Sequence, residues 1–289
     1  MIDPVLWNDW HVVADRTALR AGEVHRTRLL DEPLMIAATA GGAVISGKDG
    51  PLAHQACRYG LVWACLGTPA RSIPPVPEFA EAGRCITTAG SVAVHVSGPR
   101  VVENFLDLGH LGYVHAGYLG AEPHTEIVPY RIEALPEGGL VASGCKVFQP
   151  MSSPAAQGGY VVEYSYRVLR PLTVCLFKAN PLVRDRCDAI YLFVQPVSEE
   201  HAVAHALMLF VADGTDAEAM RAFQQMIFMQ DKPILENQVP KRLPLAPGAE
   251  LAIAADRSSV AYRRWLASLG LRYGVIAEAS GAPRSNLAA

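Results

Sequence analysis

The sequence lacks the features that mark several large classes of protein. Charged residues make up only 18% of its 289 residues and the formal net charge is −3, so it offers neither a basic face for phosphates nor a solvating acidic tail. It has no apolar run approaching the roughly 20 residues that cross a bilayer, and its start has no basic and then apolar export signal. We therefore expect a cytoplasmic protein with no nucleic-acid or membrane partner.

Cysteine is scarce as well, with six residues in the chain. They are too few and too irregularly spaced for a disulfide framework. We therefore expect reduced, mostly buried thiols at Cys57, Cys65, Cys85, Cys145, Cys175 and Cys187. Internal repeats are also absent, whereas a hydrophobic share of 51% is enough for a large core with an enclosed pocket.

The first part of the sequence contains short β-type runs separated by Gly, Asp and Pro, which predict a small antiparallel β unit. These runs begin at His11, Arg28, Leu34, Ala43 and Leu61. Residues 70–79 then contain three prolines, a stiff extended connector in which no helix can run. We place the domain boundary there, which gives a β-rich unit at 1–78 and a larger unit at 79–289.

The larger unit alternates strand-like and helix-like stretches. Together they predict an α+β fold, in which helices pack on one curved antiparallel sheet. Apolar alternation favours strands at 91–96, 139–148, 160–167, 173–178, 189–195 and 205–212. Apolar residues at helical spacing favour helices from Pro99 to His110, from Asp216 to Gln238 and from Ser258 to Leu269.

One acid and two histidines lie in or just after the first of these helices, at Asp107, His110 and His115. Asp107 and His110 share a helix face, so the carboxylate can accept a hydrogen bond from the ring nitrogen of His110 that faces away from a metal. His115 lies about 140° round a regular helix from His110, so both rings face one ion only if the backbone tightens or bulges. Gly109 and Gly112 allow such a distortion.

Two neutral imidazoles and one carboxylate leave three adjacent coordination positions, the arrangement of iron(II) centres that hold dioxygen beside a substrate. We expect the carboxylate to be Asp231, because Pro233 removes a backbone donor and opens the helical turn beside it. Glu236 is the next candidate. Spacing alone leaves the question open, because a histidine pair in an apolar helix is more often structural than metal-binding.

Three other patterns have simpler interpretations. Residues 42–48 fit the Gly-x4-Gly-Lys phosphate-loop pattern, but Asp49 replaces the magnesium-binding Ser or Thr. The Ala-Val-Ile between the glycines favours a strand, so we expect a hairpin. His201 and His205 have helical metal spacing but lead into a strand, which favours a structural role. His124 is interpreted as a solvated loop residue, with a place on the pocket wall as the alternative.

Three segments of the sequence resemble the catalytic chains of Rieske non-haem iron oxygenases. The iron-binding helix of that family is matched by residues 103–115, Glu-Asn-Phe-Leu-Asp-x-x-His-x4-His. Its third-ligand helix is matched by residues 228–238. The C-terminal helix of the vanillate O-demethylase and methylxanthine N-demethylase branch is matched by residues 255–266.

By this resemblance His110, His115 and Asp231 are the ligands of Fe(2+), and Asp107 is the catalytic acid that links the iron to an incoming electron. The implied fold is a helix-grip, START-like oxygenase domain. The implied reaction is the oxidative removal of a methyl group, using O2, from a small planar aromatic substrate.

The resemblance reaches the N-terminal unit but not its centre. Residues 8–14 resemble the opening of the family's Rieske domain and residues 58–63 its close. Family members bind a [2Fe-2S] cluster with Cys-x-His and Cys-x2-His, whereas no cysteine here has a histidine two or three residues after it, and His54 precedes Cys57. Residues 1–78 are therefore expected to be a truncated Rieske remnant that holds no cluster.

The missing cluster implies that electrons come from NAD(P)H through a partner reductase that carries a Rieske cluster. Within the methylxanthine N-demethylase branch, the pattern resembles the subunit type that removes the N7 methyl group, so 7-methylxanthine is the best guess for the substrate. A sister oxygenase subunit in a trimeric or hexameric assembly is also implied. Two rivals remain: a catalytically silent structural or ligand-binding subunit, and a zinc hydrolase with the same three ligands.

Overall fold

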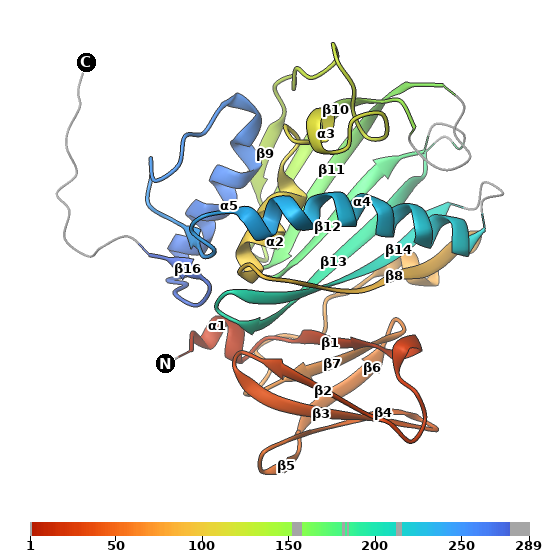
Figure 1. Ribbon diagram of the computed structural model, residues 1–289, viewed down its shortest axis with the longest axis vertical. Helices are drawn as coiled ribbons and strands as arrows, with labels where there is room; N and C mark the ends of the chain where they lie inside the picture. Colours follow the sequence, from red (N-terminus) through yellow and green to blue (C-terminus); the bar gives the residue numbers. More distant parts are fainter. Residues whose placement is uncertain (1, 152–157, 181–182, 184, 212–215, 278–289) are drawn as a thin grey trace.

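A seven-stranded antiparallel sheet forms the centre of the structure, a computed structural model that describes residues 2–151, 158–180, 183, 185–211 and 216–277 (Figure 1). Helices cover one face of this sheet and the N-terminal strands lie against the other. The α+β architecture is as expected. In spatial order the strands are β8 (Arg84–Val94), β14 (His201–Val211), β13 (Cys187–Ser198), β12 (Thr173–Ala179), β11 (Tyr160–Arg170), β10 (Leu140–Gln149) and β9 (Arg131–Ala134).

The central strands of this sheet are buried on both faces. Along β13, Ile190 and Leu192 join the core beneath the helices, whereas Tyr191 and Phe193 join the core beneath the N-terminal strands. A strand covered on both sides has an almost continuous apolar run rather than a polar alternation. Each expected strand of this sheet is present, but the bounds differ. The strand expected at 91–96 is β8, which begins at Arg84 and ends at Val94, and the expected end of β14 at Ala212 lies outside the described residues. Strand β9 was not foreseen.

The N-terminal strands form two small antiparallel sheets, not the single unit expected from the sequence. Each strand-like run falls on a strand, although the run expected from Arg28 covers only the end of β2, and β5 and β6 were not foreseen. Residues 42–47 form strand β4, which confirms the hairpin interpretation of that segment. The two sheets are β1 (His11–Asp15), β7 (Leu61–Cys65) and β6 (His54–Arg58), and β2 (Val24–Leu29), β3 (Glu32–Thr39), β4 (Gly42–Gly47) and β5 (Gly50–Pro51).

The N-terminal part shares a core with the large sheet. The ring of Trp63 on β7, fully buried, meets Phe193 on β13 edge to face, with 4.9 Å between ring centroids. Asp9 and Arg170 form a buried ion pair at 2.8 Å. The expectation that no helix runs in the proline-rich connector is wrong at its end, where a short 3-10 helix (Pro77–Ala80) begins, because proline fits the first position of a helix.

Four α-helices lie on or beside the other face of the sheet: α2 (Gly98–Leu106), α3 (Leu111–Val114), α4 (Ala217–Asn237) and α5 (Arg257–Ser268). The bounds of α4 and α5 agree with the expected helices to within two residues. The first expected helix is wrong at its end, since α2 stops at Leu106 rather than His110. Smaller elements are α1 (Pro4–Trp7), two 3-10 helices (Arg16–Ala18 and Ala254–Asp256), β15 (Leu243–Pro244) and β16 (Val275–Ile276).

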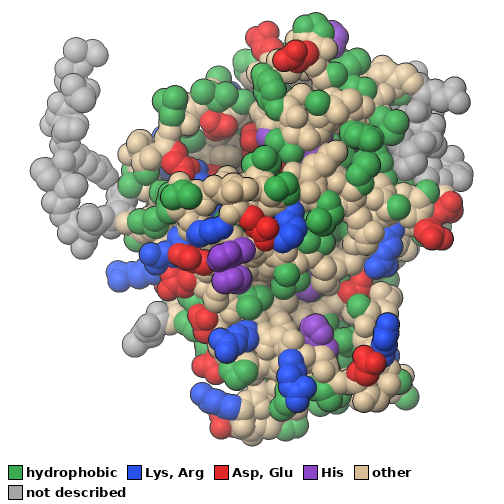
Figure 2. All heavy atoms as spheres, viewed as in Figure 1, with side chains coloured by type: hydrophobic (Ala, Val, Ile, Leu, Met, Phe, Trp, Pro, Cys, Tyr) green, Lys and Arg blue, Asp and Glu red, His purple; other side chains and the backbone are tan. Residues whose placement is uncertain are grey.

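The surface and the thiols bear out part of the expectations from composition. Acidic and basic side chains are interspersed on the face seen in Figure 2. None of the described helices is long and apolar enough to cross a membrane. None of the six cysteines, all described, forms a disulfide, but only three of them are buried (Cys65, Cys145 and Cys175), so the expectation of mostly buried thiols is half right.

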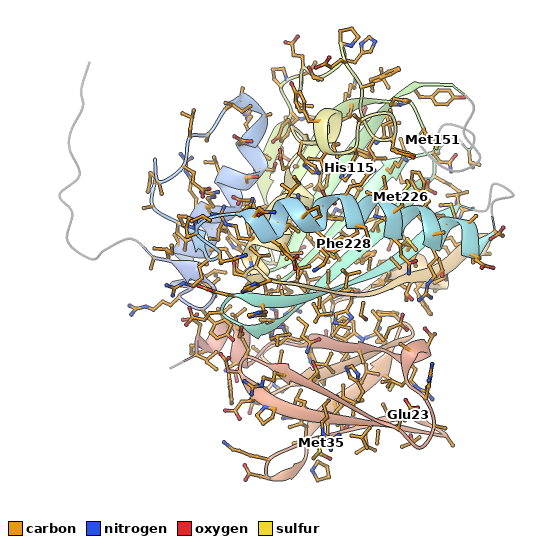
Figure 3. The ribbon with its side chains drawn as sticks, viewed as in Figure 1. Glu23, Met35, His115, Met151, Met226 and Phe228 are labelled. Atoms are coloured by element: carbon orange, nitrogen blue, oxygen red, sulfur yellow. The ribbon has the colours of Figure 1, made fainter. Side chains whose placement is uncertain are left out.

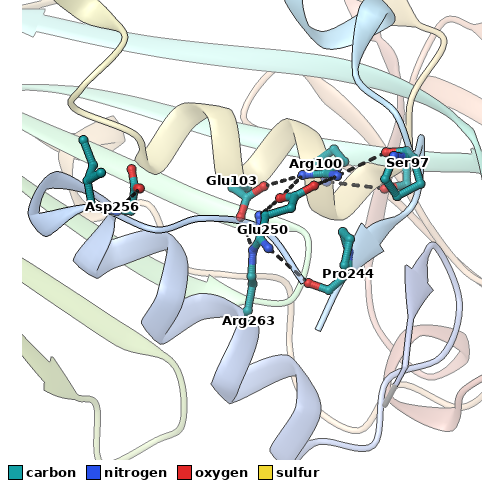
Figure 4. A network of polar contacts seen from close by, with 9 residues as sticks. Ser97, Arg100, Glu103, Pro244, Glu250, Asp256 and Arg263 are labelled. Atoms are coloured by element: carbon teal, nitrogen blue, oxygen red, sulfur yellow. Dashed lines mark hydrogen bonds and ion pairs between the residues drawn. The ribbon is translucent and has the colours of Figure 1, made fainter. Parts of the chain in front are cut away.

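Two arginines and two glutamates join α2, α5 and the segment after β15 in one ion network (Figure 4). Arg100 contacts Glu103 at 3.1 Å and Glu250 at 2.5 Å. Arg263 contacts the same two carboxylates, both at 2.5 Å. Each carboxylate is therefore shared by two guanidinium groups, and the network fixes the loop that carries Glu250 against α2.

This network predicts a pH-dependent loss of stability when Glu250 is changed. The hydrogen bond from Arg100, with a further one from Arg263, outweighs burial and lowers the pKa of Glu250 to about 2. Because the pKa is depressed in the folded protein, the stabilisation is complete above the unfolded-state pKa of about 4.3 and is lost as the pH falls towards 2. We expect Glu250→Gln to lower the free energy of unfolding by about 1–2 kcal/mol at pH 7, allowing for partial exposure of this carboxylate.

The measurement is urea unfolding of wild type and variant at pH 7, 5, 4 and 3. The matched control is Glu200→Gln, which removes an exposed carboxylate 3.7 Å from Arg242 and is expected to cost under about 0.5 kcal/mol. The difference between Glu250→Gln and wild type should shrink between pH 5 and pH 3. A difference that stayed constant across this range would contradict the proposed origin of the effect.

Candidate metal centre

Asp107 ends helix α2 and turns the chain towards the two histidines. Its backbone is extended, with a ψ of 125°, and its N–H still bonds to the carbonyl of Glu103 at 3.1 Å. Its carboxylate accepts a hydrogen bond from the N–H of Gly109 at 2.7 Å, a turn that aspartate favours. The expectation that Asp107 and His110 share the face of one helix is therefore wrong, although the contact expected between them is present.

His110 and His115 lie at the two ends of α3, a helix of a single turn. His110 precedes its first residue and His115 follows its last, and their ring centroids are 5.0 Å apart. The distortion that the spacing required is thus a break between two helices. Gly112 does not loosen a helix but permits a close approach, because a Cβ at this position would lie 2.9 Å from Cγ2 of Thr125.

Helix α4 brings Asp231 to the same point from a distant part of the chain. Its Oδ1 lies 3.3 Å from Nε2 of His110 and 3.1 Å from Nε2 of His115, and the two Nε2 atoms are 3.3 Å apart. Figure 3 shows His115 between α3 and α4. Pro233 lies within α4 without ending it, and Asp231 two residues earlier is buried. The structure therefore brings together all three side chains singled out in the sequence.

The outer nitrogen of each histidine ring donates a hydrogen bond to the protein. Nδ1 of His110 donates to Oδ2 of Asp107 at 3.2 Å, and Nδ1 of His115 donates to Oε1 of Gln230 at 2.8 Å. With the proton of each neutral ring on Nδ1, each Nε2 keeps its lone pair. Both lone pairs lie within 3.3 Å of the Asp231 carboxylate.

Three electron-pair donors that face one another repel unless a cation, either a proton or a metal ion, lies between them. Separations of 3.1–3.3 Å are close to the roughly 3 Å expected between ligands that bind one ion at about 2.1 Å and at right angles. The three side chains thus fit a metal ion. In the part of the chain that the structure describes, no other three His, Cys, Asp or Glu side chains come together in this way.

The pKa values at the cluster show that its charges favour a cation between the three side chains. Burial lowers the pKa of His110, but Asp107 and Asp231 outweigh it and raise this pKa to about 9. Burial raises the pKa of Asp231, but hydrogen bonds to His110 and His115 outweigh it and hold this pKa below its usual value. The carboxylate is therefore ionised at neutral pH, and a metal ion must displace a proton from the histidine pair.

A largely apolar cavity opens beside this cluster, between α4 and the large sheet. Ile227 and Phe228 line it from α4, and Leu176, Ile190 and Leu192 line it from the sheet. A second, more open hollow is lined by Asp107 and His110 as well, beside the Arg–Glu network. The cluster therefore lies between an apolar cavity and an outer surface.

The other candidates from the sequence lie elsewhere. Glu236 accepts hydrogen bonds from Lys232 and from the backbone N–H of His95, so it is not placed as the third ligand. The ring of His201 stacks on that of His95 with centroids 4.1 Å apart. The ring of His205 is buried between Ser91 and Gln195, with hydrogen bonds of 2.8 and 3.1 Å, and burial lowers its pKa to about 3.

The structural interpretation of His201 and His205 is therefore confirmed. His124 lies exposed in a loop, 4.5 Å from the ring of Phe148, and it is not among the residues that line the cavity. The solvated-loop interpretation of His124 is confirmed in preference to a place on the pocket wall.

Two polar residues at the cluster were not foreseen. Gln230 orients His115, and Nδ2 of Asn104 lies 3.5 Å from the carboxylate of Asp231. Both lie inside the segments that carried the family resemblance, Gln230 directly before Asp231 and Asn104 three residues before Asp107. A polar side chain next to a candidate ligand in such a segment is the signal that could have identified them.

Comparison with known proteins places this arrangement in one family. Residues 94–272 match the vanillate O-demethylase oxygenase C-terminal domain. A probable methylxanthine N7-demethylase, NdmC, of Pseudomonas sp. (strain TJI-51) is 40% identical over 270 residues, which cover 92% of this chain and 95% of NdmC. The methylxanthine N1-demethylase NdmA of Pseudomonas putida is 27% identical over 228 residues, which cover 73% of this chain but only 59% of NdmA.

Solved structures show the same fold at low sequence identity. The structure of Pseudomonas putida NdmA with caffeine superposes with a TM-score of 0.74 at 18% identity, over 96% of this chain and 98% of that one. Dicamba monooxygenase bound to 3,6-dichlorosalicylic acid superposes with a TM-score of 0.65 at 14% identity, over 91% of this chain and 97% of that one. The chain belongs to the Rieske oxygenase catalytic-domain family that includes vanillate O-demethylase and the methylxanthine N-demethylases.

Proposed function

We propose that this chain is the catalytic component of an oxygenase that removes a methyl group from a small planar aromatic, with N7-demethylation of 7-methylxanthine as the leading candidate. The observation that carries the proposal is the triangle of His110, His115 and Asp231 at the wall of an apolar cavity. The 40% identity to a probable N7-demethylase supports the choice of substrate.

His110, His115 and Asp231 are the proposed ligands of iron(II), which supplies the activation of dioxygen when bound. Asp107 and Gln230 hold the two rings in the tautomer that binds metal through Nε2. The apolar cavity walls bind a flat ring through buried area and exclude water from the reacting methyl group.

The proposed reaction balances with an external source of electrons. The substrate methyl group, O2, NAD(P)H and one proton give the demethylated ring, formaldehyde, water and NAD(P)+. Hydroxylation converts the methyl group on the ring nitrogen into a hydroxymethyl group. This group leaves as formaldehyde, and the ring nitrogen takes up the proton that its hydroxyl loses. The chain needs a donor protein, because its cysteines and histidines do not form the ligand pattern of a Rieske cluster.

We further propose that residues 1–78 are a Rieske-domain remnant without a cluster and that residues 79–289 are a helix-grip, START-like catalytic domain. Residues 278–289 of the latter lie outside the described part. The electron donor is proposed to be a reductase that carries the Rieske cluster. Asp107 is the proposed entry point for electrons, since its carboxylate holds His110 and is 29% exposed at the outer hollow.

The two rival functions predict different metal contents: no metal for a catalytically silent subunit, and zinc for a hydrolase. A catalytically silent subunit has no use for three metal-ligating side chains gathered within 3.3 Å of one another and oriented by Asp107 and Gln230, so this cluster favours the oxygenase. A zinc hydrolase fits the same three ligands but needs a bound water and a general base. Metal content and turnover together distinguish the three.

The first prediction concerns iron content. The purified chain should hold about one iron per chain and show no visible iron–sulfur absorption. His110→Ala, His115→Ala and Asp231→Ala should each reduce iron to under about a tenth of wild type, because each removes one of three ligands. The control is His124→Ala, an exposed histidine that should change nothing. Iron retained in Asp231→Ala, measured by elemental analysis, would exclude Asp231 as a ligand.

A second prediction separates electron transfer from metal binding. Asp107→Ala and Asp107→Asn should keep iron within about twofold of wild type and still bind substrate. Turnover with the reductase should fall about 100-fold or more in both variants. The reason is that the Asp107 carboxylate orients the ring of His110 but does not itself bind the ion. The matched control is Asp256→Asn, which alters a carboxylate on the same hollow that bonds to Ile253. Complete loss of iron, or near-normal turnover, in Asp107→Ala would refute the proposed role.

A third prediction concerns assembly. Val24, Met35 and Val44 on neighbouring strands β2, β3 and β4 are 47%, 44% and 41% exposed, and strands β2 and β5 are sheet edges. We propose that this surface docks a sister oxygenase subunit, in a trimeric or hexameric complex. Light scattering should show a hetero-oligomer with the sister subunit and much weaker assembly for Met35→Glu, whereas Val161→Glu, an exposed change on β11, should assemble normally. A monomer unaltered by the sister subunit would count against the proposal.

A further inference from the structure

Two tyrosines of strand β11, Tyr164 and Tyr166, line the apolar cavity from the side of the sheet. Side chains alternate along a strand, so residues two positions apart lie on the same face, here the face beneath the helices. Their rings meet nearly edge to face, with 5.9 Å between centroids. Both residues are buried, at 3% and 4% exposed. The sheet wall of the cavity therefore carries two neighbouring phenol groups.

The protons of both hydroxyls lack an acceptor among the described residues. The hydroxyl of Tyr166 makes no hydrogen bond there, and that of Tyr164 only accepts one, from Nε2 of Gln149. Lys178, the other polar side chain of this wall, already interacts within the protein. Because a buried tyrosine hydroxyl usually has a partner, two that can still donate on one cavity wall indicate a ligand with acceptor atoms.

Gln149, on the neighbouring strand β10, directs the proton of Tyr164. Its side chain is fully buried, and its Nε2–H group occupies a lone pair of the phenol oxygen. An oxygen that accepts a hydrogen bond on one side keeps its own proton for a partner on another side. Gln149 is not among the residues that line the cavity. It is therefore a positioning residue, which acts on the cavity through Tyr164.

Both phenols remain protonated at neutral pH. Burial raises the pKa of Tyr164, and the hydrogen bond from Gln149 offsets only part of this effect. Burial also raises the pKa of Tyr166 well above its ordinary value. The two hydroxyls are therefore neutral donors, which suit the neutral carbonyl oxygen of a ligand and bring no charge into an apolar cavity.

We propose that Tyr164 and Tyr166 donate hydrogen bonds to acceptor atoms on one edge of the substrate ring, and that this contact turns the opposite edge towards the metal cluster. The inference rests on the proposed function and narrows its substrate class to flat rings with a carbonyl oxygen on the edge away from the methyl group that is removed. The two walls of the cavity support it, because the tyrosines lie on the sheet whereas Asp231 lies on α4.

The test measures equilibrium binding to the iron-loaded chain without a reductase or oxygen, so that it does not depend on turnover. Two probes are used: 7-methylxanthine, which has two carbonyl oxygens, and 1-methylindole, a flat N-methylated ring system that has none. Tyr164→Phe and Tyr166→Phe should each weaken binding of 7-methylxanthine about 3- to 10-fold, the size of one neutral hydrogen bond. Binding of 1-methylindole depends on buried area alone and should change less than about twofold.

The matched control is Tyr191→Phe, which removes a buried hydroxyl from the other face of the same sheet, where it donates to Glu78 at 2.7 Å. This variant should lower the thermal midpoint and leave binding of both probes unchanged, because it removes a bond within the protein. Tyr166→Phe should do the reverse and keep the thermal midpoint of wild type, since its hydroxyl has no such bond. Iron content is measured for every variant and should not change.

A double-mutant cycle tests the role of Gln149. Gln149→Met should weaken binding of 7-methylxanthine in the wild-type background but not further in the Tyr164→Phe background, because the amide acts through that hydroxyl. An effect of the same size in both backgrounds would refute the positioning role.

The outcomes separate the inference from the proposed function. If wild type binds 7-methylxanthine and both Phe variants bind it equally well, or lose both probes equally, the tyrosine pair is refuted while the proposed function stands. If 1-methylindole does not bind wild type, weaker binding of 7-methylxanthine by Tyr166→Phe at an unchanged thermal midpoint decides alone. If wild type holds iron but does not bind 7-methylxanthine, the xanthine substrate and the inference fail together. If wild type holds no iron, the oxygenase proposal fails first.

Discussion

The close approach of His110, His115 and Asp231, three side chains that need a proton or a metal ion between them, is the constraint on which this structure depends. Asp107 and Gln230 fix the two rings from behind, and α4, which carries Asp231, packs over the sheet. The break in the helix at Asp107 contributes to the same arrangement, since it places one imidazole at each end of a one-turn helix. A metal ion that displaces the proton takes its place between the same three side chains.

The large sheet forms one wall of the cavity, so that no further layer of helices is needed on that side. Its front face supplies the cavity wall, and its rear face is covered by β1 and β7. Strands β12 and β13 are therefore supported from behind while their front residues face a space that protein atoms do not fill. A cavity wall backed in this way keeps its shape, which a substrate site needs if the ring is to be held in one orientation.

The sequence contained most of the site but not its geometry. The ligand candidates could be identified because a carboxylate and two histidines stand in segments with a recognisable order of residues. The end of α2 was not identified, because the local bond from the N–H of Gly109 to the Asp107 carboxylate competes with helical geometry, and the apolar spacing that predicted the helix does not show which of the two prevails.

The way the rear face is covered limits how far the N-terminal part of such a chain can shrink. Trp63 and Val12 pack against Phe193 and its neighbours, and Asp9 neutralises Arg170 from the same side. Without β1 or β7, the strands that shape the active-site cavity would face water on their other side. These two strands are thus structural support for the sheet, a role that is independent of any cofactor in the N-terminal unit.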